Sequence, residues 1–241
     1  MKKIIFLLFL TTSFCFGQNF FSVVVTDDAN GTIGLPSSFL NQDTSRWETI
    51  GYVIKGNPYQ ANEYAEGSTT ILNKKGFNAP MRYNAAKDVI EFLDDDQKVK
   101  EVLRRPYIKA KFNGKTYEVI AYLDNGKERL AYFNKLNSGE TQLLFQPKKQ
   151  INISSQTFQG KKEARYQDAS MYFIQKKGKP AEMIRLNQTD LLLTLSDKKA
   201  VLTKFIADYH LNLKKEADAV RLVEYYNSLI SPQPMQEKGQ S

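Results

Sequence analysis

The stretch that decides the fold runs from Tyr107 to Phe133 and reads YIKAKFNGKTYEVIAYLDNGKERLAYF. It contains two Asn-Gly pairs, Asn113-Gly114 and Asn125-Gly126, each flanked by segments in which apolar and polar residues alternate. Asn-Gly is the strongest short-range signal for a two-residue hairpin turn, because both residues tolerate a positive φ. The stretch therefore predicts three consecutive antiparallel strands.

The first hairpin has a register that its side chains support. If Asn113-Gly114 forms the loop, Ile108 lies opposite Val119 on one face of the sheet. Lys109 lies opposite Glu118 on the other face, where opposite charges stabilise the pair. Since a slip by one residue would exchange the two faces, the agreement of apolar and charged pairs predicts this register.

The second hairpin extends the same apolar face. With a two-residue loop at its Asn-Gly pair, Val119 lies opposite Tyr132 and Ala121 opposite Leu130, on the face that carries Ile108. Alternation then predicts one buried face, with lysine, arginine and tyrosine side chains on the exposed face.

Further short strands are predicted on both sides of this core. They cover residues 69–72, 81–83, 89–93, 141–146, 165–175 and 182–186. Together they predict an antiparallel β-meander over residues 67–186, in a curved and barrel-like sheet. Residues 18–66 form an irregular segment in which one or two short strands are expected.

After the meander the apolar period changes to that of helices. Asn187 is a good N-cap for a short helix, and Ser196 is a candidate cap for a second helix that ends near Tyr209. A third helix is predicted from Lys214 to Ser228 by its apolar stripe. The fold class is therefore α+β, with two or three helices in residues 187–230 packed on the sheet. The polar tail 231–241 is expected to be disordered.

The chain begins with features of an export signal. Lys2 and Lys3 precede an apolar block from Ile4 to Phe16, which is shorter than the roughly 20 residues of a membrane-spanning helix. We expect cleavage after Gly17, which gives a signal peptide of residues 1–17 and no transmembrane span. The alternative, a lipid anchor on Cys15, is disfavoured by the bulky residue before that cysteine.

Composition bounds the mature protein. The chain is 41% hydrophobic and 25% charged, which is typical of a folded domain that buries a core. Its one cysteine lies in the predicted signal peptide, so the mature chain has no disulfide. The formal net charge is +8, of which two units leave with the signal peptide. Export and the lack of an RNA-binding motif argue against nucleic acid, so the expected partners are another envelope protein or an anionic or amphiphilic ligand.

Candidate site residues are few. His210 is the sole histidine and is interpreted as a residue at a helix end, because no nucleophile motif accompanies it. The run Asp94–Asp96 lacks the spacing of a calcium loop and is interpreted as a solvated turn. Arg82 and Tyr83, on a predicted hairpin, are the candidate ligand contacts, although alternation favours the polar face of a sheet for them. No catalytic residue, metal site or cofactor is predicted.

Several short motifs carry a family resemblance. They are GNPY at 56–59, MRYN at 81–84, IEF at 90–92 and YYNSL at 225–229. In these the chain resembles a group of exported proteins of unknown function from Bacteroidota. The resemblance implies the periplasm or the outer-membrane surface of a Gram-negative bacterium, and it brings no catalytic residue.

Three functions are compatible with these observations. The first is a non-enzymatic exported protein, a binding or structural module of the periplasm. The second is a carrier of lipid or another amphiphile in a cavity of the curved sheet, which is an analogy at the level of the fold. The third, ranked last, is a glycan hydrolase that uses two dispersed carboxylates.

Overall fold

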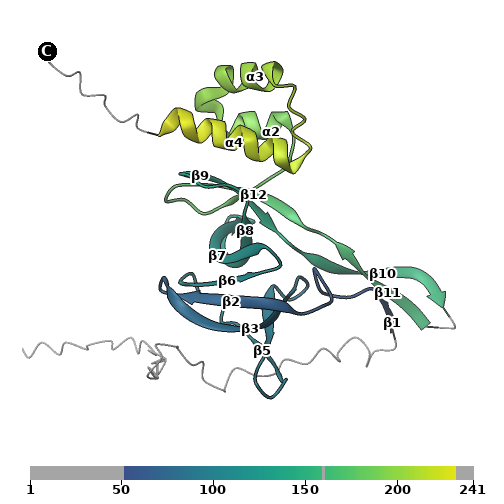
Figure 1. Cartoon of the computed structure of the whole chain (residues 1–241). Coiled ribbons are helices and arrows are strands. Elements are labelled where there is room, and N and C mark those ends of the chain that lie inside the picture. The colour runs from purple at the N-terminus through teal and green to yellow at the C-terminus, as the bar shows by residue number, and fades with distance from the viewer. Residues whose placement is uncertain (1–51, 159–160, 232–241) are drawn as a thin grey trace, which may run out of the picture.

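The computed structural model describes residues 52–158 and 161–231 of the chain (Figure 1). Ten strands form one open sheet in the order β13-β12-β9-β8-β7-β6-β2-β3-β4-β5, and helices follow it in the chain. The predicted α+β class, mostly antiparallel sheet with C-terminal helices, is thereby confirmed. The strands of this sheet are β2 Ala65–Ile71, β3 Lys74–Asn84, β4 Val89–Leu93, β5 Val99–Glu101, β6 Ile108–Phe112, β7 Lys115–Asp124, β8 Lys127–Lys135, β9 Thr141–Gln146, β12 Met171–Lys176 and β13 Glu182–Ile184.

Both central hairpins have the predicted register. In β6 and β7, Lys109 pairs with Glu118, and their charged groups lie 3.4 Å apart. In β7 and β8, Val119 pairs with Tyr132. Asn113 and Asn125 have φ of 49°, the left-handed conformation that Asn-Gly turns require. The turn chemistry and the side-chain pairs therefore specify this part of the sheet.

The prediction of one buried face was wrong for β7 and β8. Val119 and Tyr132 are buried on one face, but Ile120 and Phe133 are buried on the other. Leu130, expected in the core, is 42% exposed.

The second face is buried because the sheet curls. The residue Ala181, just before β13, returns to β7, where it accepts a hydrogen bond from the Leu123 amide (2.9 Å) and donates one to the Ala121 carbonyl (2.8 Å). Ala181 and Phe173 thus join Ile120 in a second apolar cluster. The sheet is curved, as expected, but its strand order remains open.

The strand order departs from a simple meander at one point. β2 to β5 form consecutive hairpins, and β6 then returns to pair with the free side of β2. β2 and β3 are joined by a turn at Leu72 and Asn73, both of which have positive φ, so β2 ends before Leu72. At its other end, β2 begins at Ala65, four residues before the predicted strand. β5 was not predicted, because three residues are too few to show alternation.

One long hairpin carries the chain out of the main sheet. β10 Lys149–Phe158 continues β9, and β11 Lys161–Asp168 precedes β12. The pairs Met171–Gln146 and Lys149–Asp168 share one register, so β9-β10 and β11-β12 form the two sides of one long hairpin. β1 Tyr52–Lys55 adds to β11 in parallel. We call β1, β10 and β11 the arm; it extends away from the main sheet (Figure 1).

The prediction of a single strand over residues 165–175 was wrong because the ladder is interrupted. Pro147 has no amide hydrogen to donate at the position opposite Ser170. The Ser170 hydroxyl accepts a hydrogen bond from the Lys148 amide instead (3.1 Å), and the Lys148 carbonyl accepts one from the Ala169 amide (2.9 Å). A side chain therefore continues the hairpin where the backbone cannot.

The C-terminal part contains α2 Gln188–Thr194, a 3-10 turn Ser196–Lys198, α3 Lys199–Asp208 and α4 Glu216–Ile230. Asn187 caps α2 as predicted, since its side-chain oxygen accepts a hydrogen bond from the Asp190 amide (2.8 Å). The predicted Ser196 cap was wrong. Only Leu195 separates α2 from the 3-10 turn, and its carbonyl, not a serine side chain, accepts the hydrogen bond from the Lys198 amide.

The helices pack on β9, β12 and β13. Leucines of the three helices share an apolar cluster with Leu143, Ile174 and Ile184 of the sheet. Buried Asn227 of α4 stabilises this contact through its side chain. Its Nδ2 donates to the Thr141 carbonyl (2.7 Å), and its Oδ1 accepts from the Thr141 backbone amide (2.9 Å). Within the described residues, no helix combines the length and apolar character needed to cross a membrane. The predicted signal peptide and residues 232–241 lie outside the described residues.

Candidate functional site

An arginine clamp lies where the chain enters the main sheet. Arg82 of β3 pairs with Glu91 of β4, opposite it in the ladder, at 2.8 Å. The Arg82 guanidinium also donates to the Tyr59 hydroxyl (2.6 Å) and lies over the Tyr59 and Tyr64 rings, 3.6 and 4.3 Å from their centroids. Glu91 is 6% exposed and accepts a second hydrogen bond from Asn84 (3.0 Å).

The clamp fastens residues 56–64, which we call the strap. The predicted turn GNPY opens it, and the Asn57 side chain accepts a hydrogen bond from the Tyr59 amide (3.0 Å). The Pro58 carbonyl accepts one from the Ala85 amide (2.8 Å), so the strap lies against the β3–β4 turn. Because burial disfavours the phenolate, the pKa of Tyr59 is raised.

A second polar network lies beneath the same turn. Asp88 accepts hydrogen bonds from the Tyr83 hydroxyl (2.5 Å) and the Tyr132 amide (3.1 Å), and it pairs with Arg104 at 3.3 Å. Burial raises the pKa of Asp88, against the opposing effects of Tyr83, Arg104 and Lys148. Burial and the nearby carboxylate raise the pKa of Tyr83 well above its ordinary value. Burial therefore makes the charged form of Asp88 unfavourable in the folded protein.

Replacing Asp88 by asparagine tests this effect. The folded protein binds the Asp88 proton more tightly than the unfolded chain, because the pKa of Asp88 is raised above its ordinary 3.8. Its stabilising contribution is therefore complete below pH 3.8 and is lost as the pH rises through the raised pKa. Asparagine keeps the left-handed conformation at this position, where φ is 55°.

The measurement is the free energy of unfolding of wild type and Asp88→Asn in urea, at several values between about pH 3.5 and about pH 7. We expect wild type to lose stability relative to Asp88→Asn as the pH rises. A difference between the two proteins that does not change over this range would show that Asp88 is not desolvated.

The candidate ligand residues Arg82 and Tyr83 are adjacent in β3 but point to opposite faces. Arg82 lies in the clamp, and Tyr83 is 1% exposed and stacks on Tyr117, with ring centroids 5.1 Å apart. The side-chain contacts described for both are to neighbours within the fold, so a ligand role for them stays a prediction.

The other singled-out residues lie in turns. Asp94 accepts hydrogen bonds from the Asp96 and Lys98 amides, so the acidic run forms the β4–β5 turn, as interpreted. His210 is exposed just beyond α3, with φ of 50°, at the helix end to which it was assigned.

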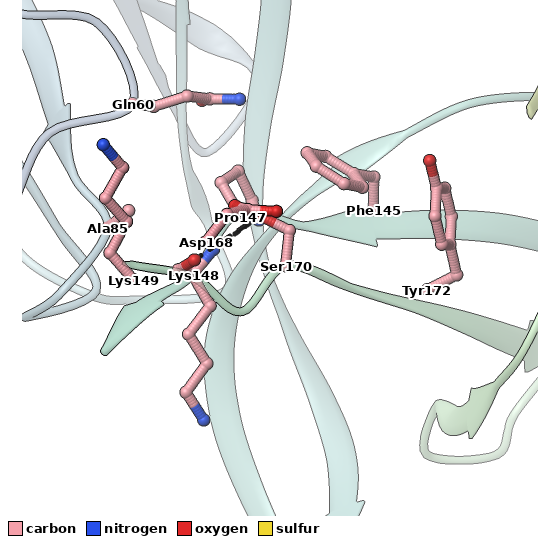
Figure 2. Close-up of a pocket in the computed structure, with 9 residues that line it drawn as sticks. All are labelled: Gln60, Ala85, Phe145, Pro147, Lys148, Lys149, Asp168, Ser170 and Tyr172. Atoms are coloured by element: carbon pink, nitrogen blue, oxygen red, sulfur yellow. Dashed lines mark hydrogen bonds between the residues drawn. The ribbon is translucent and has the colours of Figure 1, made fainter. Parts of the chain in front are cut away.

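An open hollow lies where the arm leaves the main sheet (Figure 2). Its volume is about 380 Å³. We call it the junction hollow; its lining residues are Gln60, Ala85, Phe145, Pro147, Lys148, Lys149, Asp168, Ser170 and Tyr172. Six of these come from one face of the long hairpin, because its register places 145, 147 and 149 opposite 172, 170 and 168. The strap and the β3–β4 turn supply the opposite side.

The junction hollow combines rings with charged groups. Phe145 and Tyr172 contact each other, with ring centroids 5.2 Å apart, at one end of it (Figure 2). Lys149 donates from its amino group to the Asn57 carbonyl of the strap (3.3 Å), and Ser170 donates to Asp168 (2.7 Å). Burial, with a hydrogen bond to Glu216, raises the pKa of Tyr172 to about 12, so this ring stays uncharged.

Sequence reasoning missed the junction hollow. Its residues come from three separate segments, and the missing signal was the register shared by β9-β10 and β11-β12 across Pro147. The pairing of Arg82 with Glu91 was easier to predict, because the predicted hairpin around residues 85–88 places these two residues opposite each other. No family model matches this chain, and neither a curated protein nor a solved structure is significantly similar to it.

Proposed function

We propose that this protein is an exported, non-enzymatic binding module of the envelope of a Gram-negative bacterium, resident in the periplasm or at the outer membrane. The predicted export signal in the first 17 residues, the lack of cysteine in the rest of the chain and the Bacteroidota-like motifs support this placement. The one observation that carries the binding role is the junction hollow, because it joins two aromatic rings and the Lys149 amino group on a scaffold held by hydrogen bonds.

The proposed ligand is an amphiphilic anion. Lys149 lines the junction hollow on the same face of the hairpin as the Phe145–Tyr172 ring pair, whereas the Lys148 amino group points away from these rings (Figure 2). An anionic group can then lie near Lys149 while an apolar ring or chain contacts the aromatic pair. The strap hydrogen bonds and the continuous hairpin hold these groups in place, so binding requires little ordering of the protein.

Support for a carrier in an enclosed cavity is weaker. The described apolar side chains gather in three packed clusters, and the junction hollow is open and partly polar. Support for a glycan hydrolase would be two carboxylates across one hollow, whereas among the described residues Asp168 is the one acid that lines this hollow.

The test of ligand binding uses anilinonaphthalene sulfonate, an aromatic anion, as the probe of the purified mature chain. Fluorescence titration should give saturable binding that weakens at least about fivefold in Lys149→Gln and in Phe145→Leu, which is about 1 kcal/mol for each lost contact. Lys199→Gln, at an exposed lysine of α3, is the matched control and should bind the probe as wild type does. Equal affinity in all four proteins would overturn the assignment of the hollow.

The test of export and of the non-enzymatic role uses the native organism and the purified protein. N-terminal sequencing of the protein from the periplasmic or outer-membrane fraction should begin at Gln18. A full-length protein confined to the cytoplasm would contradict export. Robust turnover in a broad panel of hydrolase assays would contradict the non-enzymatic role.

A further inference from the structure

The outer edge of the arm is unusual among the sheet edges of this protein. Among the described residues, β10 pairs with β11 alone, which leaves its other side without a neighbouring strand. The remaining edge strands are short: β5 and β13 have three residues each and β1 has four, whereas β10 has ten. Long exposed edges invite pairing with another strand, and proteins usually block them with charges or proline.

This edge lacks charges and proline, although its register with β11 shifts between Ile153 and Thr157. Residues 150–158 read QINISSQTF and contain neither a charged residue nor a proline. In a chain of net charge +8, with lysine doublets at many turns, such an uncharged stretch on an edge is exceptional. Ile153 is 50% exposed, so the stretch also presents apolar surface.

The backbone hydrogen bonds define which amides point outward. The Lys148 carbonyl accepts a hydrogen bond from the Ala169 amide, so the backbone polar groups of Lys148 point toward β11. The Lys149 amide points the other way and donates to the Ala85 carbonyl (3.0 Å). Because successive residues of a strand alternate in direction, the amide and carbonyl groups of Ile151 and Ile153 point outward, and those of Asn152 face β11. The contact to Ala85 covers the edge at Lys149, so pairing is confined to the residues beyond it.

We propose that β10 pairs antiparallel with β10 of a second copy of this chain, about a two-fold axis at Asn152. Only registers that place outward-facing residues opposite each other can form hydrogen bonds. With the axis at Asn152, Ile151 lies opposite Ile153 of the other copy, and the two Ile–Ile pairs exchange four backbone hydrogen bonds. The two arms then form one six-stranded sheet.

A second copy fits this edge because the edge is uncharged. An antiparallel strand meeting its own copy places the residue on the axis opposite itself, so a charged residue there would meet a like charge. Here it places β-branched residues opposite each other and amide opposite amide. Such a contact is isologous and closes at two subunits, so it does not lead to fibres.

The test measures the mass of the purified mature chain by light scattering over a range of concentrations. Asn152 is the decisive position, because the two copies of this residue form the non-hydrogen-bonded pair in which side chains are closest. Wild type should reach twice the monomer mass. Asn152→Lys and Asn152→Asp should each weaken the dimer at least tenfold, since each places like charges opposite each other.

Mixing the two variants distinguishes a specific pair from general damage. Asn152→Lys together with Asn152→Asp should restore dimerisation to within about threefold of wild type, because the mixed pair has opposite charges. Thr203→Lys, which adds the same charge on an exposed helix position, should dimerise as wild type does. Ile153→Pro should be monomeric yet folded, since proline is tolerated where the amide points away from the sheet.

Three results would overturn the proposal. The first is a wild-type monomer at all concentrations, which includes the case in which the chain or another protein covers this edge. The second is a dimer that both Asn152 variants leave intact. The third is a mixture of the two variants that stays monomeric.

Discussion

Replacing Glu91 by alanine should lower the free energy of unfolding by about 3 kcal/mol, because it leaves Arg82 without its carboxylate in a mostly buried site. The Glu91 and Arg82 side chains are 8% and 18% exposed, so water replaces the lost partner only in part. Asn84 also loses its acceptor. Urea unfolding at neutral pH measures the change.

The control for this prediction is the exposed ion pair of Lys204 and Asp208 on α3, whose side chains are 77% and 50% exposed. Asp208→Ala should leave stability unchanged within error, because water solvates both ions after the pair is broken. Glu91→Gln should lie between wild type and Glu91→Ala, since it keeps hydrogen-bond acceptors but removes the charge. If Glu91→Ala and Asp208→Ala had the same effect, the clamp would be no more than a surface contact.

The clamp is connected by hydrogen bonds to both proposed binding surfaces, the junction hollow and the outer edge of β10. Arg82 holds the strap against the β3–β4 turn, and the Lys149 amino group donates to the strap carbonyl of Asn57. The same turn provides the Ala85 carbonyl that binds the first amide of β10. Loss of the clamp should therefore loosen the wall of the junction hollow and the root of the arm together.

Local chemistry predicted a large part of this fold. Both Asn-Gly turns, their registers, the Val89–Leu93 strand and the Asn187 cap have the predicted places, because each depends on residues close together in the sequence. The same reasoning identified Arg82 and Tyr83 as a pair on a hairpin, but not their partners Tyr59 and Asp88.

What could not be predicted depends on contacts between distant segments. Alternation within a strand does not indicate which other strand it pairs with. It therefore could not predict that β6 pairs with β2 or that β1 pairs with β11. The junction hollow requires the strap, the β3–β4 turn and the long hairpin to meet. Sequence patterns indicate local elements such as these, but they do not show that the three elements contact one another.

Phe133 and Leu130 provide the sharpest comparison between the sequence pattern and the structure, because the two assign them to opposite environments. The pattern places Leu130 in the core with Ile108 and leaves Phe133 on the exposed face. In the structure Phe133 is fully buried against Phe173, with ring centroids 5.1 Å apart, and Leu130 is 42% exposed. The return of Ala181 to β7 brings it into the apolar cluster that buries Phe133.

Phe133→Ala should therefore cost about 3–5 kcal/mol of unfolding free energy, the range for removing a buried ring and leaving a cavity. Leu130→Ala should cost less than about 1 kcal/mol, since much of its surface is already in water. Urea unfolding of the two variants beside wild type measures both values. The reverse order would mean that the second face of β7 and β8 is not a core, and that the return of Ala181 to β7 does not cover it.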